Sequence, residues 1–373
     1  MRVPFIDTKA QYQDLKSLID GAIEQVISSG IYVLGPFNQS LERQLAALHG
    51  VKHAISVNSG TDALRIMLDA NNIGPGDEVI TSAFTFVSSI ETIVQVGAKP
   101  VMVDIDLETF NIDPKEIEKA ITPKTKAIMP IHLFGQLADM DALSSIAERY
   151  GLIILEDAAQ AVGSQYKGFY PGHFSKAAAL SFYVTKNLGA AGDGGMILTN
   201  SDQVAERCRS LRVHGMGKER YYYDDIGYAS RLAEIQAAIL SVKLTKFENW
   251  DFRNSEIASI YDRLLQDTNL ITPKTLSGNK HTWHQYTIRT QNRDELQSYL
   301  KEKGVQSMVY YPVPLNLHKP YEKYGPAPGV LKNTEVAAKQ VLSLPIHPNL
   351  NDEQVEYTAE CVNEFSLQRV LSG

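Results

Sequence analysis

Between residues 51 and 199, short apolar runs alternate with amphipathic segments. Seven of these runs have the length and composition of buried strands: Ala54–Val57, Glu78–Thr81, Lys99–Val103, Lys126–Ile131, Leu152–Glu156, Ala178–Phe182 and Gly195–Thr199. Helical patterns fill most of the gaps, at Thr61–Asn71, Thr85–Val96, Pro114–Ile121, Met140–Tyr150 and Asp202–Val213. Strands joined through helices form right-handed crossovers, so the alternation predicts a three-layer αβα fold around a seven-stranded, mainly parallel sheet.

The segments on either side of this region predict a second, smaller domain. Helical spacing covers residues 8–29 and about 38–48 before the first strand, and a long helix is expected from Arg231 to Trp250 and on to about Gln266. A loop rich in Pro, Gly, Ser and Asn follows at Asn269–Lys280. The rest predicts a strand at 284–290, a helix at 293–303, a strand at 305–309 and C-terminal helices. We therefore expect a large domain over 1–250, with an N-terminal arm, and a small α+β domain over 251–373.

Charge and composition exclude several classes of protein. A net charge of −7 argues against a general nucleic-acid binder, which would show a basic patch. No apolar run reaches the roughly 18 residues needed to span a bilayer, and the N-terminus lacks the apolar core of a signal peptide. Two cysteines are too few for a disulfide framework or a cysteine-rich metal site. We expect a cytoplasmic protein with no membrane partner and no bound metal.

Lys186 comes directly after one of the predicted strands. The apolar run Ala178 to Tyr183 is followed by Val184-Thr185-Lys186. A lysine ammonium at the end of a core strand is costly to desolvate. The side chain can be kept there as a neutral amine, or as an amine bonded to an aldehyde cofactor. A lysine that extends its charge into solvent from the rim of the sheet explains the position alone at least as well.

The segment Asn58-Ser59-Gly60-Thr61-Asp62 connects the first strand to a helix. Gly60 lets the backbone come close to a ligand, and Thr61 adds a hydroxyl. The start of a helix presents free N–H groups and a partial positive charge, so the segment suits a phosphate group. A simple capping turn, with Ser59 or Asp62 satisfying the helix end, is the favoured explanation when the segment is taken alone.

Polar and aromatic groups follow two other strands. Asp157 ends the fifth predicted strand, where it could pair with a protonated pyridine nitrogen, and Gln160 could donate to a phenolic oxygen. Phe86 follows the second strand and could lie flat on an aromatic ring. Taken singly, a carboxylate paired with a basic neighbour and a core phenylalanine are the simpler explanations.

The joint pattern is more specific than any of its members. Because ligands of an open parallel sheet sit beyond the carboxyl ends of the strands, these groups should meet at one edge. A phosphate seat, a stacking aromatic, an acid and a nucleophilic lysine together predict pyridoxal phosphate. A dinucleotide site would place G-x-G-x-x-G after the first strand, and Asn58–Asp62 contains one glycine. P-loop, H-E-x-x-H and G-x-S-x-G patterns are also absent from the sequence.

Five motifs are similar to those of a known family. They are NSGTDAL (58–64), EDAAQA (156–161), SFYVTKNLGA (181–190), GDGG (192–195) and GYASRLAEIQAAIL (227–240). With them the chain resembles the DegT/DnrJ group of pyridoxal-phosphate sugar aminotransferases, which have the fold-type I aminotransferase fold. The resemblance runs from Val3 to the C-terminal helix.

The resemblance implies a role for each candidate residue. Lys186 would bond to pyridoxal phosphate and move protons, and Asp157 would pair with the pyridinium nitrogen. The other implied cofactor contacts are Gln160 at the phenolic oxygen, Phe86 against the ring, and Gly60, Thr61 and Ser181 at the phosphate. Histidine replaces the lysine in a related class of sugar dehydratases, so Lys186 favours transamination.

The resemblance also implies a homodimer with shared active sites. The 214–231 segment of one subunit would reach the cofactor of the other. The chain departs from the family here, because Ala229 stands where an asparagine usually helps to hold the phosphate. Either cofactor affinity is weaker, or Ser230 or Arg231 compensates. Val184 stands where proline is usual, which loosens the turn but removes no catalytic group.

The implied reaction transfers an amino group from L-glutamate to a nucleotide-linked keto-hexose. The GYASRLAEIQAAILSVKL stretch is similar to enzymes that aminate carbon 3, with carbon 4 as the alternative. Candidate substrate contacts are Tyr183, His214, Arg231, Tyr310 and Asn316. Arg231 would bind a carboxylate or form an interface salt bridge, and His214 would line the substrate entrance or lie in a solvated loop. Tyr310 and Asn316 replace residues that are often histidine, which leaves the identity of the sugar open.

Two other functions remain possible from the sequence. A non-catalytic regulator or binding protein that keeps the fold gains weight if Ala229 abolishes cofactor retention. A cysteine desulfurase would need an exposed, reactive cysteine on a mobile loop, whereas Cys208 and Cys361 lie in predicted helices.

Overall fold

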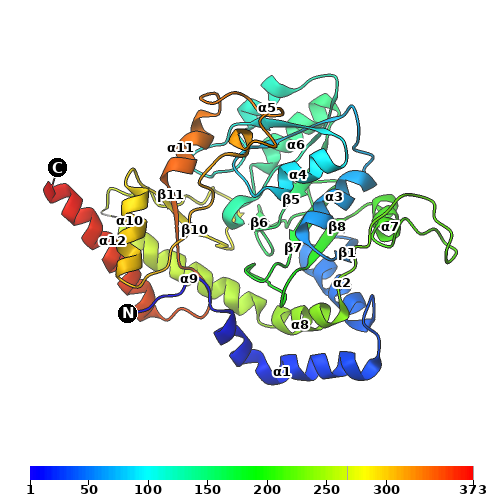
Figure 1. The fold of residues 1–373 in the computed structure, drawn as a ribbon, viewed down its shortest axis with the longest axis horizontal. Coiled ribbons are helices and arrows are strands. Elements are labelled where there is room, and N and C mark those ends of the chain that lie inside the picture. Colours follow the sequence, from blue (N-terminus) through cyan, green and yellow to red (C-terminus); the bar gives the residue numbers. More distant parts are fainter. Residues whose placement is uncertain (267, 373) are drawn as a thin grey trace.

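A seven-stranded mixed sheet forms the centre of the computed structural model, which describes residues 1–266 and 268–372 (Figure 1). The strand order is β1-β8-β7-β5-β4-β2-β3. Its strands are β1 (His53–Val57), β2 (Glu78–Ser82), β3 (Lys99–Val103), β4 (Thr125–Ile128), β5 (Ile153–Asp157), β7 (Ala177–Ser181) and β8 (Gly195–Thr199). All seven predicted strands are present, and the predicted fold class is confirmed.

Within this sheet only β8 runs against the other strands. It pairs antiparallel with both β1 and β7, whereas the pairs from β7 through β5, β4 and β2 to β3 are parallel. The carboxyl ends of the six parallel strands therefore lie along one edge of the sheet. That edge is where ligands bind in open α/β sheets.

Helices cover both faces of the sheet because successive strand residues point to opposite sides. Leu180 and Leu198 pack in one apolar cluster, and their neighbours Ala179 and Ile197 pack in another. The first cluster contains α2 (Pro36–His49), α5 (Pro114–Ala120), α6 (Met140–Tyr150) and α8 (Glu234–Leu244). The second contains α3 (Gly60–Ala70), α4 (Ser88–Gln95) and α7 (Asp202–Leu211). The result is the predicted three-layer arrangement.

The N-terminal helix α1 (Thr8–Ser29) lies along α8 (Figure 1). Leu15 and Ile19 of α1 pack on Ile239 of α8. The helix ends where Gly30 takes a left-handed conformation with φ 67°, the usual helix-ending role of glycine. This agrees with the end predicted at Ser28-Ser29-Gly30.

The C-terminal part has an apolar core of its own. Its elements are α9 (Phe247–Leu265), β10 (Tyr286–Arg289), α10 (Arg293–Glu302), α11 (Lys332–Gln340), β11 (Val341–Leu344) and α12 (Asp352–Ser372). The antiparallel pair β10–β11 packs with α9, α10 and α12, and Val3 of the N-terminal arm joins the same core. Short elements complete the chain: β6 (Gln165–Tyr166) with β9 (Asn279–Lys280), and the 3-10 turns η1 (Leu133–Gly135) and η2 (Leu315–Leu317). The division into domains at residue 250 stays a prediction, and α9 runs across it.

The prediction of one long helix from Arg231 was wrong. The structure has two helices, α8 and α9, separated at Thr245 and Lys246. The turn there is tightened, because Thr245 and Lys246 donate their N–H groups three residues back, to Val242 and Lys243. The apolar pattern continues across this break, which is why periodicity alone joined the two helices.

The strand predicted at 305–309 is also not a strand. Val305 forms an isolated bridge with Val3, and Met308 forms another with Ser343. The segment divides its hydrogen bonds between two partners, so no continuous ladder forms. The second strand of the small sheet is β11 instead, in a stretch for which only helices were expected.

No helix within residues 1–266 and 268–372 is long and apolar enough to cross a membrane.

Candidate active site

The turn between β1 and α3 packs closely on the first residue of β8. Gly195 pairs with both Val57 of β1 and Ser181 of β7. A Cβ atom added to Gly195 would lie 2.2 Å from the carbonyl oxygen of Ser59, and one added to Gly60 would lie 2.7 Å from the Cβ atom of Ser181. Both positions require glycine, and the start of α3 therefore lies against the end of β7.

The predicted phosphate seat is the N-terminus of α3. Ser59 caps the helix by accepting a hydrogen bond from the N–H of Asp62 at 3.1 Å, so the capping function foreseen for this turn is present. The Thr61 hydroxyl lies 2.7 Å from the Ser88 hydroxyl. Gly60, Thr61 and Ser181 are thus brought together, with the partial positive charge of the helix behind them.

Asp157 is a buried carboxylate at the end of β5. Its Oδ2 accepts a hydrogen bond from the Ser89 hydroxyl at 2.6 Å, and its Oδ1 accepts one from the N–H of Ala159 at 3.2 Å. Burial raises the pKa of Asp157, while the hydrogen bonds and the nearby Lys186 act in the opposite direction. A carboxylate in this setting suits a cationic hydrogen-bond donor such as a pyridinium nitrogen.

Lys186 is partly buried, and within the described residues its Nζ donates to no protein group. Burial lowers the pKa of Lys186 to about 8, and the negative charge of Asp157 opposes this shift. An ammonium extended into solvent would stay hydrated and keep its usual pKa. The lowered pKa of Lys186 therefore disfavours that alternative. Its backbone N–H donates to the Tyr183 carbonyl at 2.8 Å, which closes the turn after β7.

Gln160 and Phe86 both lie near Tyr311. The Gln160 side chain accepts a hydrogen bond from the N–H of Phe134 at 2.7 Å and donates one to the Tyr311 hydroxyl at 3.2 Å. The rings of Phe86 and Tyr311 are 6.4 Å apart between centroids. Phe86 is 55% exposed, so one of its faces is available to another ring and it is not a core residue.

A cavity of about 70 Å³ lies beside Lys186 and is lined in part by His284 and Asn187. Asn187 donates to the Thr282 carbonyl at 2.7 Å, and its side-chain oxygen lies 2.9 Å from Nδ1 of His284. Burial, with the positive charge of Lys186 as a smaller cause, holds the pKa of His284 well below its usual value. The turn that carries Lys186 is thereby tied to the C-terminal part of the chain.

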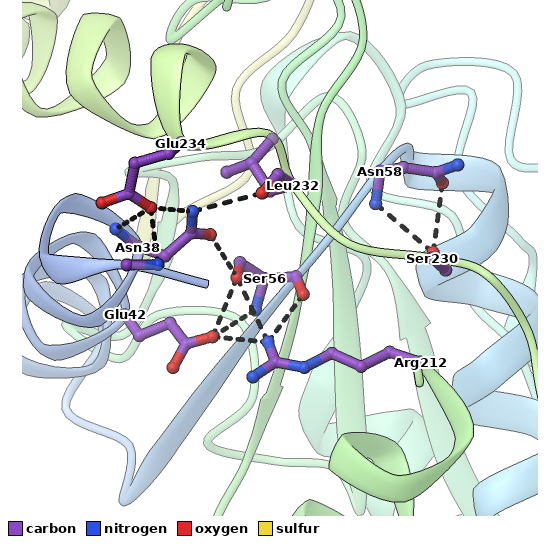
Figure 2. A network of polar contacts seen from close by, with 9 residues as sticks. Asn38, Glu42, Ser56, Asn58, Arg212, Ser230, Leu232 and Glu234 are labelled. Atoms are coloured by element: carbon purple, nitrogen blue, oxygen red, sulfur yellow. Dashed lines mark hydrogen bonds and ion pairs between the residues drawn. The ribbon is translucent and has the colours of Figure 1, made fainter. Parts of the chain in front are cut away.

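Ser230 is fully buried and contacts Asn58, the residue before the α3 turn (Figure 2). Its hydroxyl donates to the side-chain oxygen of Asn58 at 3.1 Å and accepts from the N–H of Asn58 at 3.3 Å. The contact places the 228–232 segment beside the predicted phosphate seat of the same chain.

The predicted substrate residues fall into three places. His214 and Arg231 contact each other, with Nε2 and Nη1 3.2 Å apart, and neither bonds to Lys186 or Asp157 within the described residues. Tyr310 packs against Phe5 and Tyr311, and the exposed Tyr183 lies near enough to influence its pKa.

Asn316 has its own contacts, in a different segment. It is buried in η2 and donates to the Pro326 carbonyl at 3.1 Å. A Cβ atom added to Gly325 would lie 2.4 Å from the Cβ of Asn316, so the two segments are in close contact. Its predicted part in substrate binding stays a prediction.

Sequence reasoning missed four residues that touch this site: Ser89, Tyr311, His284 and Asn58. Ser88-Ser89 follows Phe86 at a helix start, where serine is ordinarily a cap. Tyr311 and His284 come from segments about a hundred residues or more away from Lys186 in the chain. Asn58 lies within the NSGTDAL motif, but its partner Ser230 is 172 residues away in the chain, so their contact is seen only in the folded protein.

The assembled residues fit pyridoxal phosphate. A glycine-lined helix start could receive the phosphate, and an exposed aromatic ring could stack on the cofactor ring. A buried carboxylate could pair with the ring nitrogen, and an amine without a partner among the described residues could bond to the aldehyde. Lys186 and Asp157 are close enough to shift each other's pKa, as expected of two groups that would act on one cofactor ring.

Curated relatives of this chain include both enzymes and a regulator. The chain is 50% identical over 98% of its length to a "Pleiotropic regulatory protein" of Geobacillus stearothermophilus, 99% of which is covered. It is 43% identical to a dTDP-3-amino-3,4,6-trideoxy-alpha-D-glucose transaminase of Streptomyces venezuelae, covering 98% of this chain and 96% of the relative. A UDP-2-acetamido-2-deoxy-3-oxo-D-glucuronate aminotransferase of Pseudomonas aeruginosa is 44% identical, over 95% of this chain and 98% of the relative.

Solved structures agree closely with the fold. DesV of S. venezuelae, in complex with a ketimine intermediate, matches with a TM-score of 0.96 at 43% identity, over 98% of both chains. NtdA of Bacillus subtilis, with the bound cofactor PMP, matches with a TM-score of 0.91 at 32% identity, over 97% of this chain and 85% of NtdA. The model of the DegT/DnrJ/EryC1/StrS aminotransferase family matches residues 13–363. The chain therefore belongs to this family, and it is a sugar-nucleotide aminotransferase whose cofactor is pyridoxal phosphate.

Proposed function

We propose that this enzyme transfers an amino group from L-glutamate to carbon 3 of a nucleotide-linked keto-hexose, in amino-sugar biosynthesis. The observation that carries the proposal is the pair formed by Lys186 and Asp157. Among the residues that the structure describes, the Lys186 amine has no protein partner, burial lowers its pKa to about 8, and it lies beside a buried carboxylate. Such a pair supplies a base and an electrostatic partner for the cofactor ring in one site.

Each residue of the site has a separate task in this proposal. Pyridoxal phosphate, when bound, supplies an aldehyde that bonds to amines and a ring that accepts electrons. Lys186 would hold the cofactor through its amine, and as a neutral amine its Nζ would accept the proton from the donor α-carbon. Asp157 keeps the ring nitrogen protonated. The remaining contacts are Gln160 at the phenolic oxygen, Phe86 on the ring, and Gly60, Thr61 and Ser181 at the phosphate.

The position of amination is supported by relatives. Names that specify a 3-amino or a 3-oxo sugar belong to relatives at 43% and 44% identity that cover most of this chain. Tyr183, Tyr310, His214, Arg231 and Asn316 remain the proposed substrate contacts. Carbon 4 stays the alternative, because the residues that face the sugar are not fixed by these similarities.

A non-catalytic regulator is the alternative from another class. It is favoured by one observation, the regulatory name of the relative at 50% identity. The unpaired amine of Lys186 and the buried Asp157 speak against it, because a protein that only bound a partner would gain nothing from this pair.

The test is a panel of 3-keto and 4-keto sugar nucleotides incubated with the purified enzyme and glutamate. Replacement of the carbonyl oxygen by an amino group is read from the mass of the sugar. We expect conversion of 3-keto substrates, and Lys186→Ala as control should convert none and lose the visible absorption of the bound cofactor. Conversion of the 4-keto set alone would reverse the choice of carbon. No conversion by a wild-type protein that also fails to bind the cofactor would favour the regulator.

We also propose a homodimer in which the 214–231 segment reaches the partner's site. This segment carries exposed apolar side chains: Tyr221, Tyr222, Tyr223 and Ile226. Ile226 is 91% exposed in the single chain, which is unusual for isoleucine unless another molecule covers it.

A further inference from the structure

Asn58 lies at the start of the turn between β1 and α3. Only one of the two polar atoms of its side-chain amide has a hydrogen-bond partner among the described residues. The side-chain oxygen accepts a hydrogen bond from Ser230, and within the described residues the amide nitrogen Nδ2 has no protein partner. Asn58 is exposed, although Ser230 is fully buried. Figure 2 shows the amide nitrogen on the side of Asn58 away from Ser230.

The hydrogen bonds determine which way the amide is turned. The backbone N–H of Asn58 donates to the Ser230 hydroxyl, so that oxygen already acts as an acceptor. Its own hydrogen needs an acceptor, because a buried hydroxyl hydrogen without one is costly. The side-chain oxygen of Asn58, at 3.1 Å, is that acceptor. If the amide were turned the other way, its nitrogen would face Ser230, and the hydroxyl hydrogen of Ser230 would have no acceptor.

Ser230 is itself held by a buried network (Figure 2). Its N–H donates to the Arg212 carbonyl at 3.0 Å. The Arg212 guanidinium donates to Glu42 at 2.6 Å and to the carbonyl of Ser56, in β1, at 2.8 Å. The same Glu42 oxygen accepts the N–H of Ser56 at 2.9 Å. Asn58 lies two residues after Ser56, directly beyond the end of β1. The network therefore holds Ser230 against the end of this strand.

The network also neutralises its own charge. Arg212 is paired with Glu42, and on α3 Arg65 is paired with Asp62 at 2.6 Å. Neither cation is left without a carboxylate near the turn. With these two cations occupied, neutral N–H and O–H donors and the helix dipole are available to an anion bound at the turn.

We propose that Asn58 is an additional ligand of the cofactor phosphate, through Nδ2, and that Ser230 is a positioning residue that fixes its amide. Ser230 cannot touch the phosphate itself, because it is fully buried and both roles of its hydroxyl are used by Asn58. The inference rests on the proposed role of the Gly60–Thr61 turn as the phosphate seat. It gives this chain a donor at the turn although residue 229 is alanine.

The test compares pyridoxal phosphate with pyridoxal, which lacks the phosphate. Cofactor-free protein is titrated with each compound, and binding is followed by visible absorption. Loss of a hydrogen bond to a charged group is expected to make Asn58→Ala bind pyridoxal phosphate about tenfold to a hundredfold more weakly. Its affinity for pyridoxal should be unchanged. Asn71→Ala, at the other end of α3, is the matched control and should change neither affinity.

A second variant separates binding from folding. Asn58→Asp keeps the oxygen that accepts from Ser230 and puts a carboxylate oxygen in place of Nδ2. Because the carboxylate repels the phosphate, Asn58→Asp should weaken the binding of pyridoxal phosphate more than Asn58→Ala does. The binding of pyridoxal should again be unchanged. Equal weakening of both compounds, or no weakening of either, would overturn the role of Asn58.

The role of Ser230 is tested by a double-mutant cycle. Ser230→Ala alone should lower the preference for pyridoxal phosphate over pyridoxal, by less than Asn58→Ala does. In the Asn58→Ala background it should not change that preference further. An equal additional loss there would show that Ser230 acts independently of Asn58. A wild-type protein that binds neither compound would instead refute the proposed cofactor site as a whole.

Discussion

At the scale of single residues, Lys186 and Asp157 control each other's ionisation. Burial disfavours the charged form of each, and the opposite charge of the other restores part of what burial removes. The outcome for Lys186 is a pKa of about 8. Roughly a tenth of the amine is then neutral at pH 7, far more than for a lysine with an ordinary pKa of about 10.4. A neutral amine is the form that can attack an aldehyde.

Substituting Asp157 by Asn should shift the pH dependence of cofactor attachment. In the wild type, the attachment rate should rise with pH around the Lys186 pKa of about 8, since the ammonium predominates below it. Asp157→Asn removes the negative charge that raises this pKa, so the rise should move to lower pH. Stopped-flow absorption at a series of pH values measures it. Asp294→Asn, which removes an exposed carboxylate on α10, should leave the profile in place. An unmoved profile in Asp157→Asn would contradict the coupling.

Removing the Ser89 hydroxyl should slow turnover. Its hydrogen bond to Asp157 is buried and charge-assisted, and such bonds contribute about 1.5–3 kcal/mol, or roughly a tenfold to hundredfold loss in kcat. Because this bond lowers the Asp157 pKa, Ser89→Ala should lose more activity as the pH falls. Steady-state rates across pH are the measurement, with Ser145→Ala on α6 as control. A uniform loss at all pH values would point to packing instead.

At the scale of elements, the side chain of Glu234 caps the N-terminus of α2. Gly35 has no side chain to cap the helix, and the carboxylate of Glu234 takes over this function from the start of α8. It accepts from the N–H groups of Gly35 at 2.9 Å and Phe37 at 2.5 Å, and from the side chain of Asn38 at 2.6 Å. One residue thus fastens two helices that are almost two hundred residues apart in the chain.

Glu234→Ala should destabilise the protein by about 2–4 kcal/mol, since it removes a helix cap and several charge-assisted hydrogen bonds at once. Glu234→Gln, which keeps one acceptor oxygen, should cost less. Urea unfolding followed by circular dichroism gives both values. Glu248→Ala, an exposed glutamate in the first turn of α9, is the control. A loss below about 0.5 kcal/mol, the range of ordinary surface substitutions, would mean that water replaces the carboxylate.

At the scale of the whole molecule, exposed apolar side chains lie on adjoining segments. Ile31, Tyr32 and Val33 are each about half exposed, and Val33 bridges to Ala233. The 214–231 segment, with Ile226, is joined to the same region through residues 228–234. Together they form the surface that we expect the second subunit to cover.

Ile226→Glu should shift the protein from dimer to monomer. Burial of an isoleucine contributes about 2 kcal/mol, and in a symmetric dimer each substitution acts twice. Sedimentation velocity over a range of concentrations measures the change. Phe252→Glu, on an exposed face of α9, should leave the dimer intact. A wild-type protein that sediments as a monomer at all concentrations would refute the shared site.

Local patterns in the chain determined the layers of this fold. Each of the seven strands is a short apolar run and most helices between them carry an apolar face, and both patterns depend only on residues near in sequence. The positions of the strand ends therefore predicted that Gly60, Asp157 and Lys186 lie near one another, because parallel strands bring their carboxyl ends to one edge of the sheet.

Only the tertiary structure decided the contacts that join distant segments. The break between α8 and α9, the pairing of β10 with β11, the bond from Ser89 to Asp157 and the orientation of Asn58 by Ser230 all depend on which groups meet after folding. A serine or an asparagine has the same local preferences whether its partner is a buried carboxylate or water. Its partner is fixed by packing, where an unpaired buried polar group is too costly to remain.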